Sequence, residues 1–357
     1  ELHTIDSQVR FNGVLKLQSD VRIDTDTDDA DDGTGGNVIF TNDTSINSGD
    51  GTDDVPSTQT AERNSLSIDV GGFSVLFNED IGNMQSLGSL IIEQADERVV
   101  FGQADDEVSD TGGLGPVNVI SADGGIDIGL TNNVVGVDST GTLRANGGIF
   151  VNGGVGNLIE FNSFDNDVRF NGVLTLQTDL RIDSDPDDAD DGTGGNVIFT
   201  NDTPIDSGDG TDSTALTTSD ERNTFTIDAG GASVLFNEDI GSTQSLGLFT
   251  IEQADTRVVF GQADNEVGDS GSVGPVNVVS ADAGIDLGTG GDVIGRDSAG
   301  MLIANGGIVV NGGQAGLIKL STIDTEVRFN GVLTLQTDLH IDTDPDDADD
   351  DTGGDVV

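Results

Sequence analysis

The sequence repeats itself at a fixed spacing of 159 residues, so that Phe11, Phe170 and Phe329 are equivalent. The segment 28–44 recurs letter for letter as 187–203. The repeats divide the chain into the end of a preceding repeat (1–10), a first repeat (11–169), a second (170–328) and the start of a third (329–357). We expect the chain to be an excerpt of a longer array, and such an array predicts a repeat architecture.

Each repeat has a shorter internal period of β-forming triplets separated by polar or glycine-rich turns. The steps between their third residues are 29, 37, 24, 27, 22 and 20 residues. Because a parallel β-helix takes about 20–27 residues per turn, an all-β, three-faced parallel β-helix (β-solenoid) of about six coils per repeat is predicted. At about 4.8 Å per stacked strand, one repeat would rise about 29 Å. The triplets are Val9-Arg10-Phe11, Val38-Ile39-Phe40, Val75-Leu76-Phe77, Val99-Val100-Phe101, Ile126-Asp127-Ile128 and Gly148-Ile149-Phe150.

Stacking the triplets in register predicts which side chains form the core. The first and third residues would form inward columns of valine and phenylalanine, and the middle residues would face outward. Ile39, Leu76 and Val100 would then form an apolar patch, covered either by the chain's own loop or by another chain. The two long steps would carry loops at 24–36 and 45–64, without strand character. Asn12, Asn42 and Asn78 would stack as a polar ladder or supply turn geometry.

Composition limits the classes of partner. The net charge is -53, and the 66 acidic residues are mostly Asp, which suits turns and oxygen-ligand cation sites. Thirteen scattered basic residues exclude a nucleic-acid or anionic-membrane partner, and no apolar run is long enough for a membrane span. Absence of Cys leaves the compartment open. Hydrophobic residues reach 34%, which favours a folded chain despite the charge.

The strongest chemical signal is an Asp-rich segment that recurs in each copy. Its D-x-D-x-D spacing lets carboxylates converge on a hard cation such as Ca²⁺, whereas without a cation they would repel each other. An EF-hand is excluded, because Asp29 replaces the sixth-position Gly and Gly35 replaces the twelfth-position Glu. A solvated acidic loop or a high-salt surface adaptation is the alternative. The predicted calcium ligands are Asp24, Asp26, Asp28, Asp29, Asp31, Asp32, Asp183, Asp185, Asp187, Asp188, Asp190, Asp191, Asp342, Asp344, Asp346, Asp347, Asp349 and Asp350.

Enzyme signatures are poor. The two histidines, His3 and His340, do not recur at equivalent positions, so a histidine-dependent site repeated in each copy is excluded. Carboxylate pairs could be drawn from so many Asp residues that no particular pair carries information. Arg10, Arg63 and Arg98 recur in the second repeat and are expected to pair with neighbouring carboxylates. We therefore expect no enzymatic activity.

The units V-x-F-N-G-x-L-x-L, L-x-I-D-x-G-G-x-x-V-x-F and A-N-G-G-I-x-V-N-G-G resemble repeats of very large bacterial surface adhesins of the filamentous-haemagglutinin-like type. The resemblance implies a right-handed parallel β-helix, secreted or on the cell surface, that serves adhesion, matrix building or filament formation. We expect an extracellular structural and adhesive fibre stiffened by Ca²⁺, whose partners are further copies of itself or cell-surface and matrix glycans or proteins. The alternatives are a carbohydrate-active β-helix (a polysaccharide lyase or epimerase) and a passive ice-, mineral- or ion-binding surface.

Overall fold

The computed structural model confirms an all-β chain, because every regular element among its described residues is a β-strand. The chain forms two compact units, 1–166 with 170–174, and 167–169 with 175–357. The described residues are 1–26, 34–41, 44–49, 63–102, 117, 119–129, 135, 148–152, 158–186, 193–200, 203–208, 222–261, 276, 278–288, 294, 307–311, 317–344 and 353–357.

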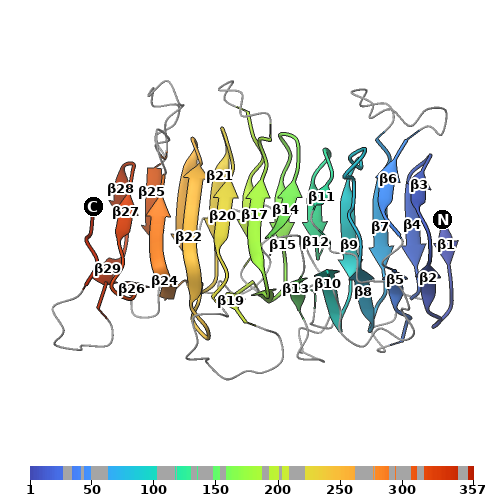
Figure 1. The fold of residues 1–357 in the computed structure, drawn as a ribbon, viewed down its shortest axis with the longest axis horizontal. Helices are drawn as coiled ribbons and strands as arrows, with labels where there is room; N and C mark the ends of the chain where they lie inside the picture. Colours follow the sequence, from blue (N-terminus) through green and yellow to red (C-terminus); the bar gives the residue numbers. More distant parts are fainter. Residues whose placement is uncertain are drawn as a thin grey trace. The chain divides into compact units, whose positions relative to one another are not determined.

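Unit 1 is a three-sheet parallel β-helix in which the chain visits the sheets in turn, so each strand pairs with one from the next turn (Figure 1). The β1 sheet contains β1 (Leu2–His3), β4 (Val21–Asp24), β7 (Leu66–Asp69), β9 (Leu90–Gln94) and β12 (Ile126–Ile128). The β2 sheet contains β2 (Val9–Phe11), β5 (Val38–Phe40), β8 (Ser74–Phe77), β10 (Arg98–Gly102) and β13 (Ile149–Asn152). The β3 sheet contains β3 (Leu15–Leu17), β6 (Ile46–Ser48), a bridge at Ile81, β11 (Val119–Ser121) and β14 (Leu158–Asn162).

Unit 2 repeats this architecture. Its β18 sheet contains β18 (Val197–Phe199), β21 (Ser233–Phe236), β23 (Arg257–Gly261), β25 (Gly307–Asn311) and β28 (Leu333–Leu335). Its β17 sheet contains β17 (Asp179–Asp183), β20 (Phe225–Asp228), β22 (Leu246–Gln253), the end of β24 (Val278–Leu287) and β27 (Val327–Phe329). Its β19 sheet contains β19 (Ile205–Ser207), a bridge at Ile240, the start of β24, β26 (Leu317–Ser321) and β29 (Asp338–Asp342). The strands β15 (Val168–Phe170) and β16 (Leu174–Leu176) each contain residues of both units.

The predicted core columns are confirmed. Val9, Val38, Val75 and Val99 are register partners across β2, β5, β8 and β10, and the phenylalanines two residues later are partners too. Successive rings from Phe11 to Phe101 stack with centroids 4.9–5.1 Å apart and almost parallel planes. Each such aromatic pair contributes about 0.5–1.5 kcal/mol beyond area burial. The triplet spacing therefore places one ring per turn in a continuous stack.

The outward column is also buried. Ile39, Leu76 and Val100 are at most 5% exposed and form a cluster against which Phe150 packs. Unit 2 contains the equivalent cluster of Leu235 and Val259. The patch is thus covered within the chain, whereas most of the loop predicted to cover it lies outside the described residues.

Three details of the predicted coils are wrong. Ile126–Ile128 pairs with Leu90–Ile92 in the β1 sheet and not with Val99–Phe101. Ile149, Phe150 and Val151 align with Val99, Val100 and Phe101, so the sixth triplet is shifted by one residue. Residues 46–48, expected in a loop, form β6, where Ile46 is fully buried. Periodicity alone did not distinguish strands of different sheets, because all three sheets use similar β-branched segments.

The polar ladder is only partly as predicted. Thr41 and not Asn42 follows Phe40 directly, and its hydroxyl donates to Asn12 Oδ1 at 3.2 Å. Asn78 Nδ2 donates to the carbonyl oxygen of Phe40 at 3.0 Å. Asn42 lies outside the described residues. The position after the phenylalanine thus carries hydrogen bonds between turns, through a mixed Asn and Thr column.

One repeat is not a whole number of turns. In unit 1, Phe11 lies in the β2 sheet, but the segment at its equivalent, Phe170, extends the β1 sheet, where Asn171 N donates to Ile128 O at 2.8 Å. In unit 2, Val168 N donates to Asn196 O in the β18 sheet, whereas the equivalent Val327 pairs with Ile285 in the β17 sheet. In both units, a residue and its equivalent in the next repeat therefore lie in different sheets. The later residue lies one step back, in the sheet that the chain visits immediately before the sheet of the earlier one.

The step gives the turn length. Within the described residues, the first repeat passes fourteen sheet positions, namely the strands β2 to β14 and the Ile81 bridge. With three sheets per turn, 159 residues make four and two-thirds turns of about 34 residues each. The predicted six shorter coils are therefore replaced by fewer and longer ones. At about 4.8 Å per turn, the expected rise per repeat falls to about 22 Å.

Candidate cation site at the base of the Asp-rich loops

The Asp-rich segment of the first repeat begins where β4 ends, and its base is closed by one side chain. Thr25 Oγ1 donates to the carbonyl oxygen of Gly36 at 2.7 Å and accepts from Gly36 N at 3.1 Å. The hydroxyl of Ser184 makes the first of these contacts to Gly195 at 2.6 Å, and that of Thr343 makes it to Gly354 at 2.9 Å. The same closure therefore holds the loop base in all three copies.

The first two predicted ligands, Asp24 and Asp26, lie at this base and are 4% and 5% exposed. Asp26 N donates to Asp24 Oδ1 at 3.1 Å, which forms an Asx turn. The equivalent bond between Asp185 N and Asp183 Oδ1 is 3.1 Å long, and that between Asp344 N and Asp342 Oδ1 is 3.3 Å long. The sequence repeat is thus also a repeat of local geometry.

Asp26 packs against a glycine of the next turn. Gly71 has a φ of +54°, and a Cβ placed on it would lie 2.3 Å from Asp26 Oδ2. Gly230 has the same relation to Asp185, at 2.2 Å and a φ of +48°. A side chain at either glycine would strain the backbone and collide with the carboxylate. These glycines therefore make room for the carboxylates at the loop base.

Asp24 is held by an arginine that the sequence did not single out. Arg22 donates from Nη1 to Asp24 Oδ2 at 2.7 Å and from Nη2 to Glu93 Oε2 at 2.8 Å, and its Nη2 lies 3.4 Å from Asp69 Oδ2. Asp24 and Asp69 are register partners on β4 and β7, so parallel pairing places the two carboxylates side by side. We call Arg22, Asp24, Asp69 and Glu93 the arginine–carboxylate column.

Unit 2 repeats this column. Arg181 lies 3.2 Å from Asp183, 3.8 Å from Asp228 and 3.2 Å from Glu252. A faint sequence signal exists, because Val21–Asp24, Leu66–Asp69 and Phe225–Asp228 all end in Ile-Asp. Which strands lie side by side could not be read from this signal, since long loops separate them.

Burial strongly affects the acidity of the column. It raises the pKa of Asp69 to about 6 and that of Asp228 to about 7, and the following glycine N–H and the arginine offset this only in part. Burial would also raise the pKa of Glu93, but hydrogen bonds from Arg22 and Ser67 bring it below its usual value. One arginine thus compensates three carboxylates unequally, and Asp69 is the least compensated.

The remaining predicted ligands lie outside the described residues. They are Asp28, Asp29, Asp31, Asp32, Asp187, Asp188, Asp190, Asp191, Asp346, Asp347, Asp349 and Asp350. Within the described ranges, no group of three or more His, Cys, Asp or Glu residues could hold a metal ion. Asp24 and Asp183 already contact an arginine and accept from a backbone N–H.

The predicted pairing of repeated arginines is confirmed for one position. Arg63 Nη2 lies 2.5 Å from Asp123 Oδ2, and the equivalent Arg222 lies 2.6 Å from Asp282. The described part of the chain contains no helix long and apolar enough to cross a membrane. Neither a protein-family model, nor a curated protein, nor a solved structure matches the chain.

Proposed function

We propose that this chain is part of an extracellular structural and adhesive fibre, in which Ca²⁺ at the Asp-rich loops stiffens an acidic β-helix at the cell surface. The observation that carries the proposal is the loop base, which is built alike in three copies by a hydroxyl–glycine closure and an Asx turn. A base of constant geometry presents the following carboxylates in the same way each time, which suits a hard cation.

A structural role, as opposed to a catalytic one, is also favoured by the features that recur in the second repeat. The stacked rings, the arginine–carboxylate column and the loop base recur in the second repeat. A catalytic groove needs a single asymmetric set of reacting groups, whereas a fibre gains from identical units. Further copies of the chain, or glycans and proteins of a cell surface or matrix, are the proposed partners.

Beads coated with the chain test the adhesive role. We expect them to cluster or to attach to a cultured cell monolayer several-fold more in millimolar Ca²⁺ than in EGTA. A variant with Asn at all predicted ligands except Asp24, Asp183 and Asp342 should lose this difference. Attachment equal to that of albumin-coated beads, with no clustering, would overturn the proposal, as would turnover of a polysaccharide.

A matched control is available at three equivalent exposed positions. Asp6, Asp165 and Asp324 have φ values of 50–56°, a region that Asn also adopts. Replacing all three with Asn removes charge at the same place in each repeat, outside the loops. This control should keep the calcium dependence.

A further inference from the structure

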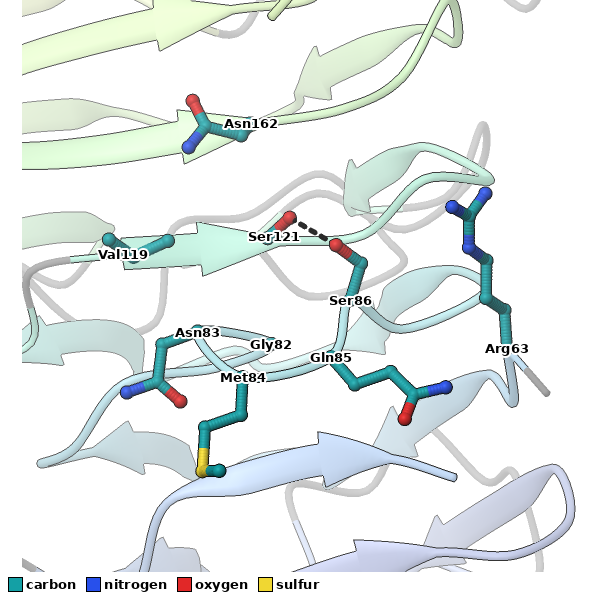
Figure 2. A pocket seen from close by; sticks show the side chains of 9 residues that line it. All are labelled: Arg63, Gly82, Asn83, Met84, Gln85, Ser86, Val119, Ser121 and Asn162. Carbon is teal, nitrogen blue, oxygen red and sulfur yellow. Dashed lines mark hydrogen bonds between the residues drawn. The ribbon is translucent and has the colours of Figure 1, made fainter. Parts of the chain in front are cut away.

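A hollow of about 310 Å³ lies in unit 1 at the turn 82–86. In the sequence, this turn follows the Ile81 bridge of the β3 sheet and precedes β9 of the β1 sheet. Figure 2 shows the turn facing Ser121 and Asn162, with Arg63 at one side. Residues from four successive segments of the chain thus meet there, although no motif marks them in the sequence.

The turn is fixed by hydrogen bonds to its neighbours. Asn47 Oδ1 accepts from the backbone N–H groups of Met84 at 3.0 Å and Gln85 at 3.2 Å. The hydroxyls of Ser86 and Ser121 are 2.7 Å apart, as the dashed line in Figure 2 marks. These contacts hold the hollow open without help from a ligand, as expected of a binding site.

The described lining of the hollow is electrically neutral, although the chain is very acidic. Among the described residues no carboxylate lines the hollow, and the one cation in this lining, Arg63, is paired with Asp123 at 2.5 Å. The two carboxylate oxygens of Asp80, which precedes the turn, accept from Asn83 Nδ2 and Val119 N. Arg63 is already paired and is therefore a poor partner for an anionic ligand. The described lining also offers no carboxylate to a cationic ligand. A neutral ligand is therefore favoured.

The lining suits hydroxyl groups. Asn83, Gln85 and Asn162 contribute amides, which both donate and accept, and the two serines contribute hydroxyls. Gln85 Nε2 is buried without a hydrogen-bond partner, so a ligand oxygen that reaches it would relieve the cost of an unsatisfied buried donor. Met84, 58% exposed, adds an apolar surface beside these polar groups. Amides beside an apolar surface match the alternating C–H and O–H groups of a sugar ring.

We propose that this hollow binds one neutral sugar residue of a glycan. The inference deepens the proposed adhesive function and rests on it, because a glycan site would give the fibre its target. One sugar ring per hollow would be held by the amides of Asn83, Gln85 and Asn162, with Met84 against its C–H face.

The second repeat provides a natural comparison. Its frame is the same, since Arg222 pairs with Asp282 and the hydroxyls of Ser245 and Ser280 are 2.6 Å apart. At the lining positions, however, Ser242, Thr243 and Ser321 replace Asn83, Met84 and Asn162. Asp206 takes the place of Asn47 and accepts from the N–H groups of Thr243 and Gln244. This turn folds without the proposed sugar contacts, so its residues can be exchanged into the first repeat.

Saturation-transfer NMR with the whole chain tests the proposal. The probes are the methyl glycosides of glucose, galactose and mannose and N-acetylglucosamine, with glucuronate and glucosamine as charged comparators. At least one neutral sugar should give transfer, and N83S/M84T should reduce it at least about fivefold. The reverse exchange S242N/T243M/S321N should increase it. Absence of transfer from every neutral sugar, transfer only from a charged one, or no change in N83S/M84T would overturn the proposal.

The bead assay separates this inference from the proposed function. If beads carrying N83S/M84T attach as well as the unchanged chain, the sugar site is wrong while the adhesive role stands. If the unchanged chain binds a sugar through this hollow but its beads neither attach nor cluster, the adhesive role is wrong while the site stands.

Discussion

Asp24 and Asp69 lie side by side in adjacent strands and contact the same guanidinium group. Arg22 Nη1 is 2.7 Å from Asp24 Oδ2, and Arg22 Nη2 is 3.4 Å from Asp69 Oδ2. Glu93, from the next turn, accepts from the same Nη2 at 2.8 Å. Three successive turns of the β-helix thus each place a carboxylate on one cation. In a chain with a net charge of -53, loss of this arginine would leave three neighbouring carboxylates without their shared cation.

Replacing Arg22 with Met should lower the free energy of unfolding by about 1–3 kcal/mol, because it leaves three partly buried carboxylates uncompensated. Urea unfolding in EGTA, followed by circular dichroism, measures the loss. Arg10→Met, on the exposed side of β2, is the control and should change stability by less than about 0.5 kcal/mol. Equal effects of the two substitutions would show that the column does not stabilise the fold.

The pH dependence follows from Asp69 and Asp228, whose pKa values rise to about 6 and about 7 on folding. The folded chain therefore binds these protons more tightly than the unfolded chain does. The associated stability is present below the usual Asp pKa near 3.8 and is lost as the pH rises through 6 to 7. Without calcium, the melting temperature should fall as the pH is raised over this range.

Asn substitutions isolate that contribution from the general charge repulsion. Asp69→Asn with Asp228→Asn should flatten the pH dependence, because neutral amides replace the titrating groups. The exposed pair Asp6→Asn with Asp165→Asn removes the same charge and should leave the slope nearly unchanged. Identical slopes in all three proteins would contradict the assignment to the column.

Gly71→Ala should destabilise the chain by at least about 2 kcal/mol, because it combines a left-handed backbone with a collision. The φ of Gly71 is +54°, and its added Cβ would lie 2.3 Å from Asp26 Oδ2. Asp26→Ala removes the colliding Oδ2 and Cγ and leaves only the Asp26 Cβ, at 2.8 Å, so the double substitution should cost less than the sum of the two single ones. If thermal unfolding shows that the effects of the two single substitutions simply add, residues 71 and 26 are not in contact and the prediction is wrong.

The turn length can be tested by disulfide formation, since the chain has no cysteine of its own. Ile91 and Asp127 are register partners on β9 and β12. Cysteines at these two positions should form a disulfide under mild oxidation, because neighbouring strands bring their Cα atoms within the required range. Cysteines at Val100 and Asp127, which six coils per repeat would have made neighbours, should not. The opposite result would restore the six-coil division.

The parts of the fold that could be predicted are those recorded by a short stretch of sequence. Val9, Val38, Val75 and Val99 were placed correctly in one column because each starts the same short β-forming triplet. Ile126 starts a similar triplet but belongs to another sheet, since the sheet is decided by the lengths of the intervening turns and not by the triplet itself. A strand can therefore be assigned to one of the three sheets only when the strands that pair with it in the adjacent turns are known.

The site shows the same limit. Asp24 and Asp26 were singled out because they belong to a dense local run of carboxylates. Arg22 was overlooked although it lies two residues away, because its importance comes from Asp69 and Glu93, which are distant in sequence. Parallel pairing between turns brings these groups together, and no local pattern records that pairing.

Titration of the metal-free chain with CaCl₂ by isothermal calorimetry, with MgCl₂ for comparison, tests the calcium-stiffened fibre most directly. We predict saturable Ca²⁺ binding of about one ion per Asp-rich loop, weaker Mg²⁺ binding and a higher melting temperature when Ca²⁺ is bound. Asn at Asp6, Asp165 and Asp324 should leave this binding intact. No saturable heat beyond that of the variant with Asn at the loop carboxylates, together with an unchanged melting temperature in EGTA, would contradict the proposal.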